Sequence, residues 1–138
     1  MRLWHHDIIE LLPKSQLLAQ WRELNSIFAK EDRHILINYI YDYPKEHLYT
    51  YTQLVLHEMK KRGFTIRTFD KMNRYFEGVD ANKKVEHPFA KHHNDEYFEI
   101  CYFNLKEKYL RGQKDFDESR FHALDEQYKS VQARKDML

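Results

Sequence analysis

The chain has 138 residues, of which 42% are hydrophobic, 33% charged and 15% aromatic. This composition excludes a disordered chain and is typical of one folded, soluble domain, because so few residues leave little room for a second core. Lys and Arg number 23 against 22 acidic residues, so the formal net charge is only +1. The chain therefore lacks the basic balance of many nucleic-acid-binding proteins, and any DNA site must be a local patch.

The single cysteine, Cys101, rules out an internal disulfide and is typical of a reducing compartment. No apolar run is long enough to span a membrane, and the first residues lack the pattern of a secretory signal. We therefore expect a cytoplasmic protein with no membrane association. Cys101 stands among apolar positions, so we expect a small buried residue and not a nucleophile.

The first twelve residues, MRLWHHDIIELL, carry too many large apolar side chains to remain in water. We expect this segment to pack onto the domain and to fix the position of the terminal amine. His5 and His6 are adjacent and have no partner at helical spacing, and His92 and His93 form a second such pair in a loop expected to be solvated. We expect no metal site and no cofactor from these pairs.

The first helix is predicted over QLLAQWRELNSIF, from Gln16 to Phe28, with Pro13 in its first turn. An apolar stripe at helical spacing predicts its buried side: Leu17, Trp21, Leu24 and Phe28. Arg22 and Glu23 fall well away from this stripe and should face outward. On their own these two residues fit a solvated surface better than an active site.

The next segment passes through a charged cluster, KEDRH, into HILINYIYDY, which fits either a short strand or an extended connection. Its aromatic residues lie near basic ones and could stack on nucleotides, although ordinary packing is the more frequent role of such rings. The residues concerned are Tyr39, Tyr41 and Tyr43, with Arg33 and Lys45.

A second helix is predicted from Lys45 to Arg62, preceded by Pro44 and ended by Gly63. Its last turn is basic, with Lys60, Lys61 and Arg62. These charges can complement the helix dipole or contact DNA phosphates, and the sequence favours neither role.

Residues 64–93 are irregular, with a possible short helix from Thr68 to Phe76. Asn94 should cap a third helix that ends near Leu110, and a final helix follows Asp117. The final helix can pack on the domain or lie at a subunit contact, and no obligate protein partner is evident. The expected fold is all-α: a single domain, residues 1–138, of three or four helices with long irregular connections and little sheet.

Two strings resemble the phage-type pyrimidine-dimer DNA glycosylases, which are small helical repair enzymes. QLLAQWREL, followed by Ile27-Phe28 and Arg33-His34, is similar to the first helix of that family, and HEMKKRGF to the end of its second long helix. The resemblance is best over residues 1–66. It implies a DNA N-glycosylase with abasic-site (AP) lyase activity, which removes ultraviolet-damaged bases from double-stranded DNA and then nicks the strand.

The resemblance also implies two catalytic residues. The family reacts through its N-terminal α-amine, which forms an imine with the deoxyribose, and here Met1 stands in the place of its threonine. A methionine before Arg2 is not expected to be removed, so the reacting amine would be that of Met1. Glu23 matches the family's catalytic glutamate, which stabilises positive charge on the sugar and assists proton transfer.

The same resemblance matches Arg22 to a phosphate-contacting arginine and His34 to a histidine that follows the first helix. With the basic residues that the sequence itself singles out, the expected DNA contacts are Arg2, Arg22, Lys30, Arg33, His34, Lys60, Lys61 and Arg62. Two other classes remain open on the residues alone: a non-catalytic helical nucleic-acid-binding protein, and a protein-interaction module that uses the aromatic-rich helices.

Overall fold

The computed structural model describes residues 1–137 and contains five α-helices and no strand among them. The all-α prediction is confirmed, but three or four helices was too few. The elements, with two short 3₁₀-helices, are η1 (Ile9–Leu11), α1 (Lys14–Ala29), η2 (Asn38–Asp42), α2 (Lys45–Lys61), α3 (Asp70–Tyr75), α4 (Asp95–Leu110) and α5 (Glu118–Asp136).

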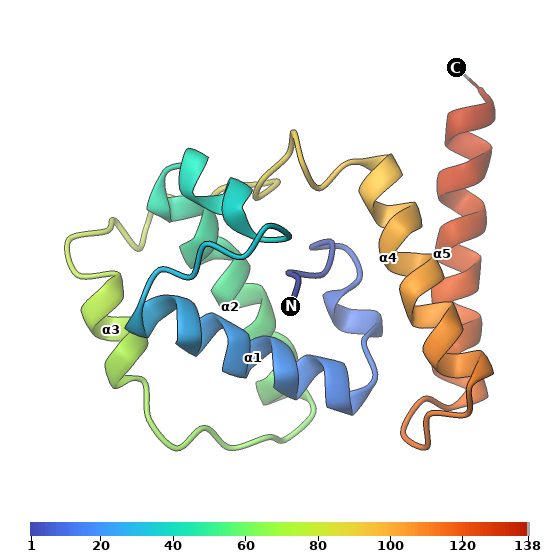
Figure 1. The fold of residues 1–138 in the computed structure, drawn as a ribbon, viewed down its shortest axis with the longest axis horizontal. Helices are drawn as coiled ribbons and strands as arrows, with labels where there is room; N and C mark the ends of the chain where they lie inside the picture. Colours follow the sequence, from blue (N-terminus) through green and yellow to red (C-terminus); the bar gives the residue numbers. More distant parts are fainter. Residues whose placement is uncertain (138) are drawn as a thin grey trace.

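Helix α1 lies at the centre of one half of the molecule, in contact with α2 and α3 (Figure 1). It begins two residues earlier than predicted, because Pro13 serves as the N-cap and accepts a hydrogen bond of 3.1 Å from the Leu17 amide. Leu17, Leu24 and Phe28 are buried as the stripe predicts. On the side toward α3, Trp21 and Phe28 pack edge-on or tilted against aromatic rings of the α3 region.

The segment 34–43 is not a strand. Ile37 and Ile40 are both buried, and their spacing of three residues suits the 3₁₀ turn of η2, which places both on the core side. The β-branched residues of this segment suggested a strand, in which every second residue is buried. The same residue types also occur in a 3₁₀ turn, in which every third residue is buried, so composition alone does not decide between the two.

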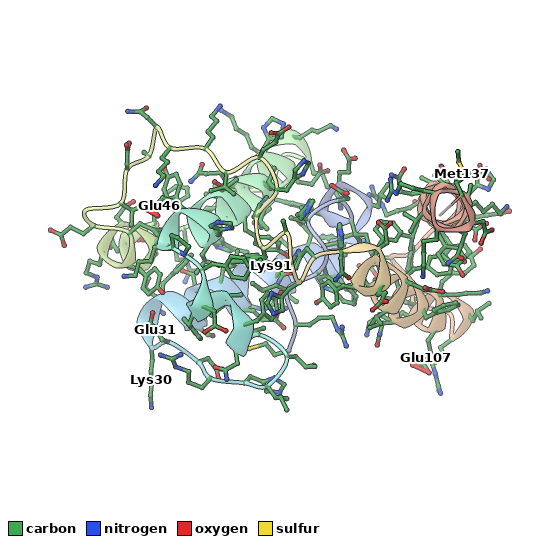
Figure 2. The ribbon with its side chains drawn as sticks, turned by 90° about the horizontal axis from the view of Figure 1, so that it is seen from above. Lys30, Glu31, Glu46, Lys91, Glu107 and Met137 are labelled. Atoms are coloured by element: carbon green, nitrogen blue, oxygen red, sulfur yellow. The ribbon has the colours of Figure 1, made fainter. Side chains whose placement is uncertain are left out.

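Helices α4 and α5 form an antiparallel hairpin at one end of the molecule (Figure 1). Side-chain caps start both helices, since Asn94 accepts from the Tyr97 amide and Asp117 from the Arg120 amide. The helices are joined by stacked rings, with Tyr102 and Tyr128 only 3.9 Å apart between ring centres. Figure 2 shows the pair from above, with α5 nearly end-on beside α4. The final helix therefore packs on its own chain.

The first twelve residues lie between the α1–α2 pair and α4, as Figure 1 shows. Leu3, Ile8 and Leu12 are fully buried, so the prediction that this segment packs onto the domain is confirmed. Cys101 is buried as expected. Within residues 1–137, none of the helices combines the length and apolar character that crossing a bilayer demands.

His93 is buried, which corrects the prediction of a solvated loop for this residue, whereas His92 is exposed as expected. The amide of His6 donates to Nδ1 of His93 at 3.2 Å, and the hydroxyl of Tyr39 lies 2.5 Å from its Nε2. Burial lowers the pKa of His93 far below its ordinary value. The ring is therefore a neutral link that joins the N-terminal segment to the loop before α4.

Candidate active site

An open pocket of about 380 Å³ contains both residues that the resemblance singled out as catalytic. Four parts of the chain meet there: the N-terminus, the exposed side of α1, the connection after α1, and the C-terminal half of α4. Its lining consists of Met1, Arg2, Trp4, Gln16, Ala19, Glu23, Leu36, Asn104 and Lys108.

Gln20 fixes the N-terminal segment against α1. Its side chain is fully buried, and its Oε1 accepts a hydrogen bond of 2.8 Å from the Trp4 amide. Its Nε2 donates to the Arg2 carbonyl at 3.1 Å and to Oε2 of Glu23 at 3.0 Å. One buried amide thus holds both the main chain next to the terminal amine and the carboxylate beside it.

Two tyrosines from other helices complete this anchor. The Tyr51 hydroxyl of α2 lies 2.6 Å from the Trp4 carbonyl and 2.9 Å from Oε1 of Gln20. The Tyr97 hydroxyl of α4 donates to the Leu3 carbonyl at 2.5 Å. Burial raises the pKa of both phenols, so both remain protonated donors. The N-terminal main chain is therefore held by α1, α2 and α4 together.

Glu23 is half-buried and faces the pocket, although the periodicity of α1 predicted an outward position. The N-terminal segment packs against this side of the helix and covers part of the carboxylate. Burial raises the pKa of Glu23, and the positive charges of the terminal amine and Arg22 oppose that shift, as does the hydrogen bond from Gln20. The site thus pairs a partly desolvated carboxylate with a nearby amine.

Cations surround this single carboxylate. Met1, Arg2 and Lys108 all line the pocket, and the guanidinium of Arg2 lies 5.9 Å from the ring centres of both Trp4 and Tyr97. Arg22 is exposed on the adjoining surface of α1. A local basic patch therefore exists in spite of the nearly neutral whole chain.

Three further predicted DNA contacts lie on the connection between α1 and η2. Lys30 is exposed and extends away from the molecule at the end of α1 (Figure 2). Arg33 lies over the ring of Tyr41 at 4.1 Å, with its side chain 62% exposed, and His34 is also exposed. None of the three lines the pocket, but Leu36 of the same connection does.

The basic end of α2 lies outside the pocket. There Arg62 forms hydrogen bonds within the protein, whereas Lys60 and Lys61 are exposed. Its guanidinium donates to Oε2 of Glu58 at 2.7 Å and to the carbonyls of Leu12 and Glu10 at 2.7 and 3.1 Å. These bonds tie the end of α2 to the N-terminal segment. Lys60 and Lys61 are exposed, so a phosphate contact there stays a prediction for the two lysines.

His5, His6 and Asp7 form a separate group whose possible ligand atoms lie within 4.8 Å of one another. Nδ1 of His5 accepts a hydrogen bond of 3.1 Å from the Asp7 amide, and Nδ1 of His6 lies 2.9 Å from Oδ1 of Asp7. Burial lowers the pKa of His5 to about 4. Nδ1 of each histidine therefore already has a partner in Asp7.

Sequence reasoning missed much of the pocket lining. Gln20 gave a signal, since it is a polar residue on the side of α1 that carries Leu17 and Leu24, and a buried polar group requires partners. Asn104 gave another, because it interrupts the apolar stripe of α4. Nothing in the sequence placed Leu36 or Lys108 beside Met1.

The sequence model of the pyrimidine dimer DNA glycosylase family matches residues 1–72, just over half of the chain. The match includes Met1, all of α1 with Glu23, and the connection that carries Leu36, whereas Asn104 and Lys108 lie beyond it. No curated protein and no solved structure matches the chain. The chain belongs to the pyrimidine dimer DNA glycosylase family, and this membership implies DNA as the class of substrate.

Proposed function

We propose that this protein excises ultraviolet-induced pyrimidine dimers or related base lesions from double-stranded DNA and then cleaves the strand as an AP lyase. The α-amine of Met1 is the nucleophile and Glu23 is the catalytic carboxylate. One observation carries the proposal: Met1 and Glu23 line the same pocket, closely enough for the amine's charge to lower the pKa of the carboxyl against the effect of burial.

The chemistry requires that an amine and a carboxylate of the protein act on the same deoxyribose. The neutral amine attacks C1′, the glycosidic bond breaks, and the base leaves with the bonding electrons and takes up a proton. The amine loses a proton and the sugar ring opens to a protonated imine, which makes the C2′ hydrogen acidic. Loss of that proton breaks the C3′–O bond, and the 3′ phosphate departs.

Glu23 serves two steps of this sequence. Its negative charge stabilises the positive charge that develops on the sugar as the base departs. Its carboxylate then accepts or relays a proton during imine formation and elimination, for which a pKa raised above that of an ordinary carboxyl is an advantage. The hydrogen bond from Gln20 holds the carboxylate in place for both roles.

The anchored N-terminus supports the same mechanism. A flexible terminus would have to be ordered in each reaction, whereas Gln20, Tyr51 and Tyr97 fix the main chain of residues 2–4 in advance. Positioning of this kind removes an entropic part of the barrier before the substrate arrives.

The exposed cations suit the DNA backbone. Arg2 and Lys108 lie in the pocket, Arg22 adjoins it, and Lys30 and Arg33 continue along the neighbouring connection. Contacts from such residues to phosphates fix the register of the protein on the duplex, while recognition of the lesion depends on the pocket.

Borohydride trapping on duplex DNA with one abasic site tests the proposal, because reduction of an imine leaves a stable protein–DNA bond. We expect a covalent complex with the natural chain and none after one residue is added before Met1 or after its amine is methylated. Trapping that survives displacement of the amine would make Lys14 or Lys30 the better nucleophile. Salt-dependent DNA binding without trapping by the natural chain would instead indicate the non-catalytic binding protein.

A further inference from the structure

A second open pocket, of about 300 Å³, shares no lining residue with the pocket that contains Met1 and Glu23. Three separate stretches of the chain meet there: the N-terminal segment, helix α2 and the loop before α4. Each stretch contributes one histidine to the lining, which consists of His6, Asp7, Ile9, Glu10, Leu54, His57, Glu58, Glu86 and His87.

The sequence predicted no metal site, because His5 and His6 have no histidine partner at helical spacing. The fold supplies such partners from distant parts of the chain, since His57 comes from α2 and His87 from the loop before α4. Imidazole is a favoured ligand of Zn²⁺, and three histidines that leave the fourth position open form a recurrent zinc site. The side chains of this pocket therefore have the chemistry of a zinc site.

Asp7 holds the ring of His6 in an orientation that suits a metal ligand. Nδ1 of His6 lies 2.9 Å from Oδ1 of Asp7, and the His6 side chain is only 9% exposed. The hydrogen bond from His6 lowers the pKa of Asp7, so this carboxyl remains an ionised acceptor. Because a carboxylate can only accept, the proton of neutral His6 lies on Nδ1 and its lone pair on Nε2. Carboxylates commonly fix zinc-bound histidines in this way.

His87 lies near His6 and can approach it. The centres of the two rings are 6.0 Å apart, whereas two imidazoles on one tetrahedral metal have ring centres about 5 Å apart, given metal–nitrogen distances of about 2.0–2.1 Å. The His87 side chain is 67% exposed, and its contact with Glu86 at 3.9 Å is an exposed ion pair of little strength. His87 can therefore move closer without displacing a core residue.

His57 supplies the third ring. It is exposed on α2 and lines the same pocket as His6 and His87. The ligand atoms that already lie within 4.8 Å of one another belong to His5, His6 and Asp7. A metal bound by Nε2 of His6 therefore draws His57 and His87 inward from exposed positions.

The carboxylates of the pocket offset the charge of a bound cation. Its described lining contains no lysine or arginine and four acidic residues, Asp7, Glu10, Glu58 and Glu86. Arg62 neutralises one of them, because its Nε lies 2.7 Å from Oε2 of Glu58. The ion pairs of Asp7 and Glu86 are with histidines of the pocket.

The nearby cations lie outside this lining. Arg62 and Arg120 both donate to the main-chain carbonyl of Glu10, at 3.1 and 3.3 Å. Lys83 and Lys84 line an adjoining pocket that shares Leu54 and His57 with this one. The set of three histidines therefore carries the inference, and the carboxylates support it.

We propose that His6, His57 and His87 bind one zinc ion, with Asp7 as the carboxylate that orients His6. The ion joins the N-terminal segment, α2 and the loop before α4, so its binding stabilises the folded chain. The site is separate from the pocket of Met1 and Glu23 and takes no part in the chemistry proposed there.

The test uses the full chain after its metal has been removed with EDTA and the chelator dialysed away. Zn²⁺ alone is the probe. Competition with a chromophoric chelator measures affinity and stoichiometry, and calorimetry measures the melting temperature. His57→Gln and His87→Gln each remove one ligand from an exposed position. His122→Gln is the matched control, because His122 is exposed on α5 and lies 3.9 Å from Glu126, as His87 does from Glu86.

We expect the natural chain to bind one zinc ion and to melt about 8 °C or more higher at a zinc concentration about a hundredfold above the dissociation constant. His57→Gln and His87→Gln should each weaken zinc binding by about a hundredfold or more, and Asp7→Asn by about tenfold to a hundredfold. His122→Gln should bind zinc as the natural chain does. Without zinc, the variants at exposed histidines should melt as the natural chain does.

An unchanged zinc affinity in either His57→Gln or His87→Gln would overturn the proposal. A site formed by His5, His6 and Asp7 alone would give that result. Zinc binding by the natural chain that does not saturate at one ion, or that leaves the melting temperature unchanged, would overturn it as well.

Discussion

The side-chain amide of Gln20 donates a hydrogen bond of 3.0 Å to the carboxylate of Glu23, one turn further along α1. The same nitrogen lies 3.1 Å from the Arg2 carbonyl, and the oxygen of that amide accepts from the Trp4 amide and the Tyr51 hydroxyl. A single buried residue therefore connects the terminal segment, the candidate catalytic carboxylate and helix α2.

Replacing Gln20 with Leu should weaken both the fold and the site, because an apolar side chain leaves the buried Trp4 amide and the partly buried Arg2 carbonyl without this partner. Unsatisfied buried groups cost about 1–3 kcal/mol each, so we expect a loss of about 2 kcal/mol or more in the free energy of unfolding. Urea denaturation measures the loss, and borohydride trapping should fall with it. Ser26→Ala, at an exposed position of α1, is the matched control and should change stability by less than about 0.5 kcal/mol.

Arg22→Ala should weaken DNA binding and reduce the salt slope of the affinity by about one unit, as expected for the loss of one phosphate contact. Arg62→Ala is the matched comparison, because the donors of Arg62 bond to Glu58, Leu12 and Glu10. It should leave the slope unchanged and lower stability by about 3 kcal/mol or more, since Glu58 is buried and would lose its partner. A slope that changes with Arg62 and not with Arg22 would contradict the assignment.

The buried histidines predict a loss of stability in acid. Burial lowers the pKa of His5 to about 4 and that of His93 further still, while both take up protons near pH 6.5 once unfolded. Their contribution to stability is therefore complete above about pH 6.5 and decreases as the pH falls toward 4.

Melting temperatures between pH 7.5 and 4.5 check this prediction. The decline should be smaller for His93→Gln than for the natural chain, because the amide does not titrate. His122→Gln, on the exposed surface of α5, should follow the natural chain. Parallel curves for the natural chain and His93→Gln would refute the role of His93.

The long helices were predictable because their signals are local. Asn94 caps α4 and Gly63, with a positive φ of 82°, ends α2, and both residues can be recognised from the chain on either side. The turn at Ile37 and Ile40 was not predictable, because β-branched composition suits a strand as well as a buried 3₁₀ segment. The 3₁₀ turn forms because tertiary packing buries both Ile37 and Ile40.

Some residues of the candidate site could likewise be predicted from a short stretch of sequence, and others could not. Arg22 and Glu23 could be read from one short string, since they belong to a single helix and a recognisable family motif. Lys108 could not be placed beside Met1, because their proximity depends on how α4 packs against the N-terminal segment across more than a hundred residues of chain. The half-burial of Glu23 was not predictable either, because it depends on how the N-terminal segment packs against α1.

Glu23→Gln is the most direct test of the proposed active site. Glutamine keeps the size of the side chain and an oxygen that can accept from Gln20, and it removes a charge that burial disfavours, so the melting temperature should remain level or rise. Loss of one negative charge should leave DNA affinity level or higher.

Single-turnover excision from dimer-containing duplex is the measurement, with Glu126→Gln on the exposed surface of α5 as the control. If Glu23 stabilises the charged sugar and assists proton transfer, its substitution should lower the excision rate by about a hundredfold or more, the lower range for acid–base groups, while the control keeps the natural rate. An excision rate in Glu23→Gln equal to that of the natural chain would contradict the account.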